Sequence, residues 1–141
     1  MFEVVVVGAD NSATARGAVE AAAGLAKMSG GTLHIVTVFE LKTLGKGSFP
    51  LELGVLHNEG EVDALLQDLA FLARSGGVEP VLHKIGGAPA ESLIKFAEEH
   101  DADLLVVGNV GMKGIRRVLG SVPNSVAHGA PCSVAIIDTA P

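Results

Sequence analysis

Short apolar runs alternate with longer amphipathic runs along the whole chain. The first apolar run, EVVVVGAD at residues 3–10, is rich in β-branched residues, and similar runs cover residues 32–39, 79–86, 102–109 and 131–138. Continuous apolar strands of this kind are buried on both faces, and strands that alternate with helices form parallel sheets with right-handed crossovers. The sequence therefore predicts an α/β fold with a five-stranded parallel sheet.

The segments between these strands carry helical signals. Leu93, Ile94 and Ala97 are spaced as the buried stripe of one such helix, which begins at Pro89, where the missing N–H of proline costs little. Residues 40–60 contain four glycines and a proline and predict a long loop. The other helices are expected up to about residue 28, over about residues 61–74, and from Ser121 to about His128.

Size and composition limit what the chain does. Its 141 residues suit one domain, residues 1–141, and its formal net charge of −6 argues against general binding to nucleic acid or to anionic membranes. No apolar run approaches the length of about 18 residues that a membrane helix needs. The N-terminus is predicted to be a strand rather than a signal peptide, and Cys132 is the only cysteine, so a cytoplasmic location is expected.

A glycine-rich loop follows the fourth strand. Its spacing is Gly108-x-x-Gly111-x-x-Gly114, and Gly120-Ser121 comes where the last helix is expected to begin. Glycines allow a ligand to approach the backbone closely, and a helix N-terminus offers free N–H groups to an anion. The loop therefore predicts a phosphate site, with turn glycines as the alternative.

Three basic residues lie in this glycine-rich loop of an acidic protein. Lys113, Arg116 and Arg117 are candidates to face a phosphate, and a solvated helix face is the alternative. Three cations are too few for a nucleic-acid groove.

The loop after the first strand, GADNSA, is the second half of the expected site. Asp10 follows the carboxyl end of a strand, and ligands of open α/β sheets bind there, where the strand order reverses. Asp10 is expected to accept a hydrogen bond from a base or ribose, and an indirect contact with Mg²⁺ is left open. Ser12 in the same loop is a further candidate to contact the ligand. Capping of the first helix by Asp10 and Ser12 is the alternative.

Other chemistry finds no support in the sequence. No G-x-G-x-x-G follows the first strand, and neither G-K-[ST] nor G-x-S-x-G occurs. The five histidines have no metal-ligand spacing, so neither a catalytic residue nor a metal site is assigned. Cys132 opens a strand and is expected to serve packing rather than reactivity.

Together these residues resemble the universal stress protein family, and in particular its ATP-binding branch. The resemblance rests on D-x-S at Asp10-Asn11-Ser12, on Gly108-x-x-Gly111 followed by Gly120-Ser121, and on APCSVAII before and within the last strand. It implies a doubly wound sheet of order 3-2-1-4-5 with helices on both faces. It also implies a homodimer formed through the last strand, from Ser133 to Asp138.

The resemblance also implies the residues that would hold an adenine nucleotide. The adenine would lie against the first-strand loop and a valine late in the second strand, and the ribose and phosphates against the glycine loop and the start of the last helix. By position these residues are Ala9, Asp10 and Val38 for the base, Gly108, Val110 and Gly111 for the ribose and phosphates, and Gly120, Ser121 and Val122 for the phosphates.

Three features depart from the family pattern. The interval from Gly111 to Gly120 is one residue shorter than usual, Val110 replaces a residue that is often polar or basic, and Pro123 removes a backbone N–H near the phosphate contacts. The chain nevertheless keeps its glycines, as the ATP-binding members do.

The resulting expectation is a cytoplasmic stress-response domain that binds ATP and acts as a regulator or sensor. AMP and cyclic AMP remain alternative ligands. Slow ATP hydrolysis and a ligand-free dimeric interaction protein are alternative functions, the hydrolysis less favoured because only Asp10 offers a base. A flavin carrier is least favoured because the chain has no Trp or Tyr to stack on the ring.

Overall fold

The computed structural model describes residues 1–10, 15–39, 59–109 and 121–138. Its five strands pair in the order β3-β2-β1-β4-β5, and every pairing is parallel. This confirms the doubly wound sheet expected from the sequence. In chain order the elements are β1 (Val4–Gly8), α1 (Ala15–Ser29), β2 (Thr32–Phe39), α2 (Glu59–Ser75), β3 (Val81–Gly86), α3 (Pro89–Glu99), β4 (Leu104–Gly108), α4 (Ser121–Gly129) and β5 (Ser133–Ile137).

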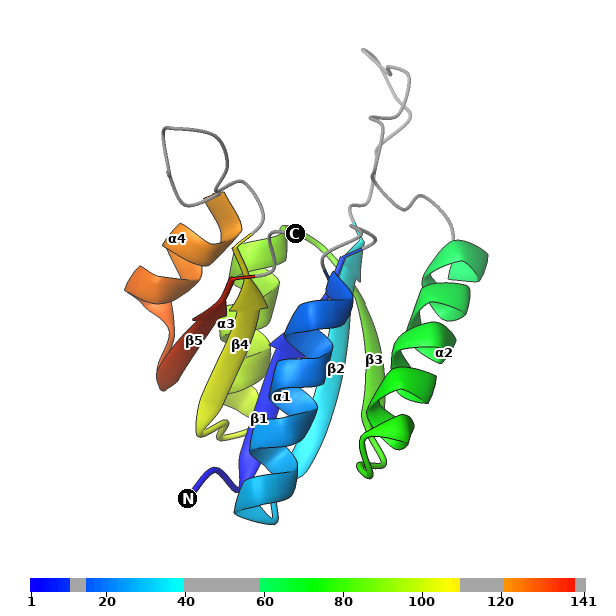
Figure 1. Ribbon diagram of the computed structural model, residues 1–141. Coiled ribbons are helices and arrows are strands. Elements are labelled where there is room, and N and C mark those ends of the chain that lie inside the picture. The colour runs from blue at the N-terminus through cyan, green and yellow to red at the C-terminus, as the bar shows by residue number, and fades with distance from the viewer. Residues whose placement is uncertain (11–14, 40–58, 110–120, 139–141) are drawn as a thin grey trace.

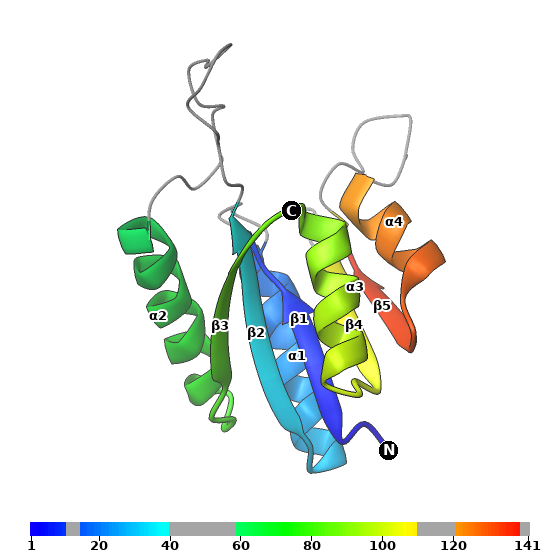
Figure 2. The same ribbon diagram turned by 180° about the vertical axis from the view of Figure 1, so that it is seen from behind.

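Helices cover both faces of the sheet (Figure 1). Helices α1 and α2 lie on one face, and α3 and α4 on the other, as the view from behind shows (Figure 2). Successive side chains of a strand point to opposite faces, so Val5 and Val7 of β1 join the core under α1, while Val6 joins the core under α3. Burial on both sides explains why the central strands are continuous runs of Val, Leu and Ile.

The helix α3 begins at Pro89, as the sequence predicts, but its buried stripe differs from the expected one. Leu93 and Ala97 are buried, whereas Ile94 is only partly buried and Phe96 takes the third core position. Phe96 packs among aromatic rings that β2 and β3 contribute, and the spacing of apolar residues within α3 did not reveal those partners.

The strand order reverses at β1, which lies between β2 and β4. The chain continues from β1 to a helix on one face of the sheet and from β4 to a helix on the other face. The two connections therefore diverge beyond the carboxyl ends of these two strands. Two backbone hydrogen bonds tie this edge together: Ala9 N donates to Val36 O at 2.9 Å, and Asn109 N donates to Ile137 O at 3.0 Å.

None of the described helices has both the length and the apolar character needed to cross a membrane.

Candidate functional site

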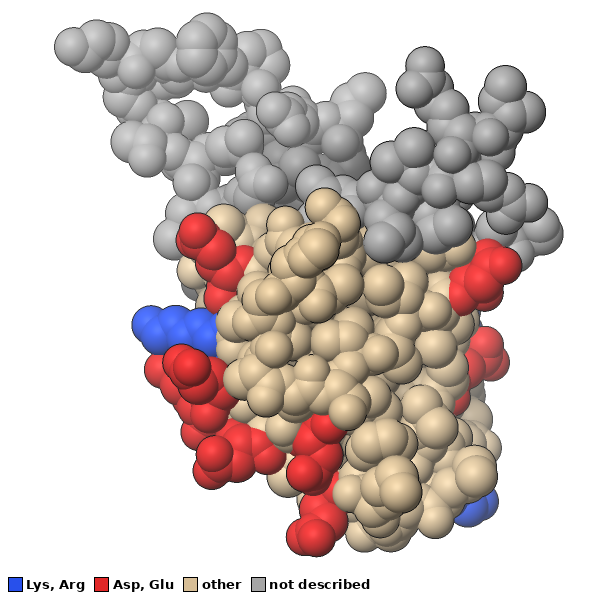
Figure 3. Space-filling model, turned by 90° about the vertical axis from the view of Figure 1, so that its left-hand side faces the viewer, with Lys and Arg blue, Asp and Glu red and all other residues tan. Residues whose placement is uncertain are grey.

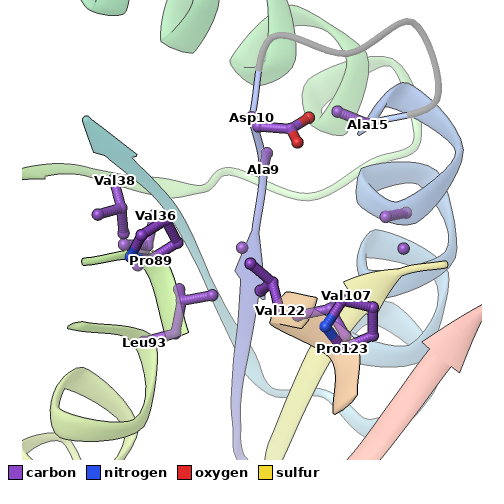
Figure 4. A pocket seen from close by; sticks show the side chains of 13 residues that line it. Ala9, Asp10, Ala15, Val36, Val38, Pro89, Leu93, Val107, Val122 and Pro123 are labelled. Carbon is purple, nitrogen blue, oxygen red and sulfur yellow. The ribbon is translucent and has the colours of Figure 1, made fainter. Parts of the chain in front are cut away.

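A cavity of about 320 Å³ opens at the carboxyl ends of the strands, where the strand order reverses (Figure 4). This volume lies within the range of roughly 300–1,000 Å³ that is usual for small-molecule sites. Three helices and three strands contribute to its lining. The lining residues are Gly8, Ala9, Asp10, Ala15, Ala18, Val36, Val38, Pro89, Leu93, Val107, Gly108, Val122 and Pro123.

The walls of this cavity are apolar. Pro89 and Leu93 of α3 lie on one side of it, and Val122 and Pro123 of α4 lie on another (Figure 4). On the α1 side the lining side chains are only the methyl groups of alanines, which leave space that larger residues would fill. Such a cavity suits a flat, weakly polar ring, because apolar walls make no demand for hydrogen bonds.

The α3 side of the cavity depends on a close approach of two elements. A β-carbon placed on Gly8 would lie 2.6 Å from Leu93 Cδ1, closer than real contacts allow. Glycine at the end of β1 therefore lets α3 pack against the sheet directly below the cavity. The side chain of Leu93 is 3% exposed, so it fills the space that Gly8 leaves.

Asp10 is the one ionisable side chain among the described residues that line the cavity. It is exposed, and its carboxylate lies near the rim, above Ala9 and beside the start of α1 (Figure 4). A carboxylate in this place can accept hydrogen bonds from the N–H or O–H groups of a ligand whose apolar part fills the cavity. Asp10 is thus positioned to orient a ligand rather than to be buried with it.

The helix α4 begins at the opposite wall of the cavity. Its first residue is Ser121, and the next two, Val122 and Pro123, line the cavity. The first N–H groups of a helix have no partner within the helix, and the helix dipole makes this end positive. An anion attached to a ring in the cavity could therefore lie at the start of α4, although Pro123 contributes no N–H.

The structure brings five of the residues expected from the sequence to one cavity: Ala9, Asp10, Val38, Gly108 and Val122. Ser121 stands at the beginning of α4, next to Val122. The remaining expected residues lie outside the described part of the chain, as does most of the loop expected over residues 40–60. They are Ser12, Val110, Gly111, Lys113, Arg116, Arg117 and Gly120.

Sequence reasoning did not identify the contribution of α1 and α3 to the cavity. Ala15, Ala18, Pro89 and Leu93 all line it. One signal was present: Pro89 follows the third strand after a short glycine-containing turn, so the start of α3 had to lie at the same edge of the sheet as the other strand ends. No pattern marked the alanines of α1, which are typical of any close helix–sheet contact.

Asn109 is a further residue that the sequence did not single out. It is 6% exposed, and its Nδ2 donates to Asp138 Oδ1 at 2.9 Å. Together with the bond from Asn109 N to Ile137 O, this contact joins the ends of β4 and β5 immediately after Gly108. It therefore fixes the point from which the glycine-rich loop departs.

Within the described residues, no group of three or more His, Cys, Asp and Glu side chains could hold a metal ion. The cavity itself carries one carboxylate, Asp10.

Comparisons with known proteins identify the family of the chain. The chain is 34% identical over 147 residues to the universal stress protein Rv1636 of Mycobacterium tuberculosis, an alignment that covers 98% of this chain and 97% of that one. A universal stress protein solved in complex with cAMP is 34% identical, with a TM-score of 0.78 and coverage of 99% and 98% of the two chains. The universal stress protein from Archaeoglobus fulgidus in complex with dAMP is 25% identical, with a TM-score of 0.67 and coverage of 97% and 98%. The sequence model of the universal stress protein family matches residues 1–138. This chain therefore belongs to the universal stress protein family.

Proposed function

We propose that this chain binds an adenine nucleotide, with ATP as the first candidate, and acts as a regulatory or sensor domain in a stress response. The observation that carries the proposal is the apolar cavity at the reversal point of the sheet, with Asp10 at one rim and the start of α4 at its wall. Relatives with bound cAMP and dAMP support the choice of an adenine nucleotide.

In this proposal the adenine occupies the apolar part of the cavity, because a flat ring suits walls built from Val, Ala and Pro side chains. Ala9, Asp10 and Val38 contact the base, and Asp10 accepts a hydrogen bond from the base or ribose. The sugar and phosphates lie toward Gly108 and the start of α4, where free N–H groups and the helix dipole favour negative charge. The further residues assigned to the ribose and phosphates are Val110, Gly111, Lys113, Arg117, Gly120, Ser121 and Val122, and Ser12 is a further ligand contact in the loop after β1.

The ligand is identified by titration calorimetry with ATP, AMP, cyclic AMP and dAMP, each with and without Mg²⁺. Tightest binding of ATP supports the proposal in full. Tighter binding of AMP or cyclic AMP keeps the adenine-nucleotide site but replaces the ligand. The absence of heat with every adenine nucleotide at millimolar concentration would reject the proposal.

The glycine loop is tested with the substitution Gly120→Val. A branched side chain beside the phosphates should abolish nucleotide binding while the far-UV circular dichroism stays near that of the wild type. Gly24→Ala provides the matched control, since a β-carbon on Gly24 meets no atom within 4 Å. Unfolding of the Gly120→Val variant would instead assign that glycine a structural role.

Slow ATP hydrolysis is the second candidate, and the position of Asp10 at the rim of the cavity is what favours it. Asp10 would have to orient or deprotonate the attacking water. The test is ATP turnover by the wild type and by Asp10→Asn, purified identically. Unchanged turnover in the variant would show that any hydrolysis does not use Asp10.

We also propose that two copies pair through β5, the edge strand that follows α4. An edge strand presents unpaired backbone groups to a partner. Acidic residues lie at the margins of this side of the molecule, while its centre is uncharged (Figure 3). Light scattering should give twice the monomer mass, and a dimer that no nucleotide stabilises would favour a ligand-free interaction protein.

The cytoplasmic location and the single-domain organisation over residues 1–141 remain predictions of the sequence.

A further inference from the structure

Three imidazole rings from distant parts of the sequence meet on the α3 side of the sheet. His34 comes from β2, His83 from β3, and His100 from the residue that follows α3. Their ring centroids are 5.2 Å apart for His34 and His83, 5.6 Å for His34 and His100, and 5.7 Å for His83 and His100. Phe96 stacks on His100 with the centroids 3.8 Å apart and meets the edge of His83 at 4.6 Å.

This histidine cluster attaches the C-terminal half of α3 to two neighbouring strands. Phe96 is 4% exposed, whereas His34 and His83 are half-buried and His100 is exposed. None of the described helices lies over β3 on this side of the sheet (Figure 2). Protons therefore reach the cluster from solvent, although its two strand histidines are largely enclosed.

The hydrogen bond inside the cluster depends on protonation. His34 Nδ1 and His83 Nε2 are 3.0 Å apart, so one of these nitrogens must donate and the other must accept. A neutral pair satisfies this requirement, and so does a pair that carries one extra proton. When both rings are protonated, two N–H groups face each other and the bond is lost. His100 Nδ1 donates to Phe96 O at 3.0 Å, which leaves its Nε2 to accept a proton.

Among the residues that the structure describes, no carboxylate compensates the charge that protonation would place on the strand histidines. Burial lowers the pKa of both His34 and His83, the positive charge of His100 lowers both further, and His34 adds to the effect on His83. The other charged residue of β3, Lys84, binds Asp63 of α2 on the opposite face at 2.9 Å. The remaining charged groups of α3 and the turn after it are exposed or bound elsewhere: Glu91, Lys95, Glu98, Glu99 and Asp101 are exposed, and Asp103 accepts from the amides of Glu3 and Val4.

Helix α3 also reaches the cavity. Pro89 and Leu93 line the cavity from the N-terminal half of α3, and Phe96 and His100 join the histidine cluster one and two turns later. A change in how the C-terminal half rests on β2 and β3 is therefore transmitted along a rigid helix to one wall of the candidate site.

We propose that His34, His83 and His100 form a proton-operated latch, which holds α3 on the sheet while the hydrogen bond between His34 and His83 persists and releases it when both of these rings are protonated. The release weakens binding in the cavity, because Pro89 and Leu93 move with the helix. This second statement rests on the proposed nucleotide-binding function, whereas the latch itself does not.

The direction of the pH dependence follows from the protonation states. An unfolded histidine has a pKa near 6.5, and folding favours the neutral form of His34 and His83. The unfolded chain consequently binds more protons than the folded chain below about pH 6.5, and stability falls as the pH decreases. Above that pH both states are neutral and the cluster stabilises the fold fully.

The first experiment measures urea unfolding from pH 8 to pH 5 for the wild type and for His83→Gln, which keeps hydrogen-bonding capacity and cannot become charged. We expect acidification to raise the unfolding equilibrium constant of the wild type more than that of the variant. The difference should be about tenfold for each unit of pKa shift that the substitution removes. His128→Gln, in α4 and outside the cluster, is the matched control and should follow the wild type. Parallel pH dependence of wild type and His83→Gln would overturn the latch.

A second measurement needs no variant and decides the matter if His83→Gln does not fold. Nuclear magnetic resonance titration of the histidine ring signals in the wild type should give two protonation steps below pH 6.5 for His34 and His83. Faster hydrogen exchange of the α3 amides should accompany them, with α1 unaffected. Ordinary titration of both rings near 6.5, without a change in α3, would overturn the latch.

The coupling to the cavity is tested by nucleotide calorimetry at pH 7.5 and pH 5.5. Binding should weaken at the lower pH in the wild type and much less in His83→Gln. Equal weakening in both proteins would overturn the coupling. If no adenine nucleotide binds at pH 7.5, the proposed function is rejected. The urea unfolding and nuclear magnetic resonance experiments still test the latch in that case.

Discussion

Leu93 of α3 packs onto Gly8 of β1 so closely that the two residues have to be considered together. A β-carbon on Gly8 would lie 2.6 Å from Leu93 Cδ1 and 2.9 Å from Leu93 Cδ2. Both residues line the cavity, so the same contact closes the hydrophobic core and forms part of the wall of the candidate site. A substitution at either position therefore affects stability and binding at once.

We expect Gly8→Ala to lower the free energy of unfolding by about 1–3 kcal/mol, because Leu93 must leave its packed position. Leu93→Ala alone should cost about 2–5 kcal/mol through the space it leaves. The double variant should lose less than the sum of the two, since the new methyl group occupies part of that space. Urea denaturation of the four proteins measures this coupling.

The matched control for this cycle is Gly24→Ala in α1. A β-carbon there meets no atom within 4 Å, and replacing glycine inside a helix should raise stability by about 0.5–1 kcal/mol. Additive losses in the Gly8 and Leu93 double variant would mean that the two side chains do not compete for one space.

Asp103 fixes the beginning of β1. Its Oδ2 accepts hydrogen bonds from Glu3 N at 2.9 Å and from Val4 N at 2.8 Å, and its own N–H donates to Val4 O at 2.8 Å. Hydrogen bonds to a charged acceptor contribute about 1.5–3 kcal/mol, so Asp103→Ala should lower the free energy of unfolding by at least that amount. Thermal or chemical denaturation checks this expectation. The exposed Glu98→Ala should change stability by less than about 0.5 kcal/mol, and a comparable loss there would contradict the assignment.

The strands and helices could be predicted from the sequence because the signals for them are local and agree with one another. The strand over residues 32–39 coincides with β2, and Pro89 begins α3 as proline at a first helical position should. Strand order is a property of the whole chain, and the resemblance to a family supplied it. The contact between β1 and β4, on which the cavity depends, could not be read from spacing alone.

The candidate site was predictable only where a motif marked it. Asp10 and Gly108 belong to loops with recognisable composition, and both line the cavity. Leu93 looks like any buried leucine, and its place in the site follows from how closely α3 approaches Gly8. The histidine cluster was not predictable either, because His34 and His83 become neighbours only through strand pairing, in which His34 lies opposite Val81 and His83 opposite Val36.

Thr37 carries a hydroxyl group in an apolar environment. The residue is fully buried in β2, and its Oγ1 has no hydrogen-bond partner among the described residues. An unsatisfied buried hydroxyl costs about 1–3 kcal/mol, and valine has nearly the same shape. Thr37→Val should therefore leave stability unchanged or raise it by up to that amount. Thr37→Ser, which keeps the hydroxyl and loses the methyl group, should lower stability, and a strongly destabilised Thr37→Val would show that the hydroxyl makes a stabilising contact.

Cys132 should react slowly with thiol reagents in the folded protein. Burial raises the pKa of the Cys132 thiol, and the negative charge of Asp103 raises it further. The thiolate is the reactive form, so at pH 7.5 the reaction rate should fall below that of free cysteine by about tenfold for each unit by which the pKa is raised. Because folding favours the protonated thiol, its contribution to stability is present below the unfolded pKa of about 8.5 and is lost as the pH rises through the folded pKa.

Reaction of Cys132 with a coloured disulfide reagent, followed in buffer and in urea, measures the difference in reaction rate between the folded and unfolded protein. Cys132→Ser should give no signal, since Cys132 is the single cysteine. Equal rates in both conditions would show that the thiol is not protected by the fold and would remove packing as its role.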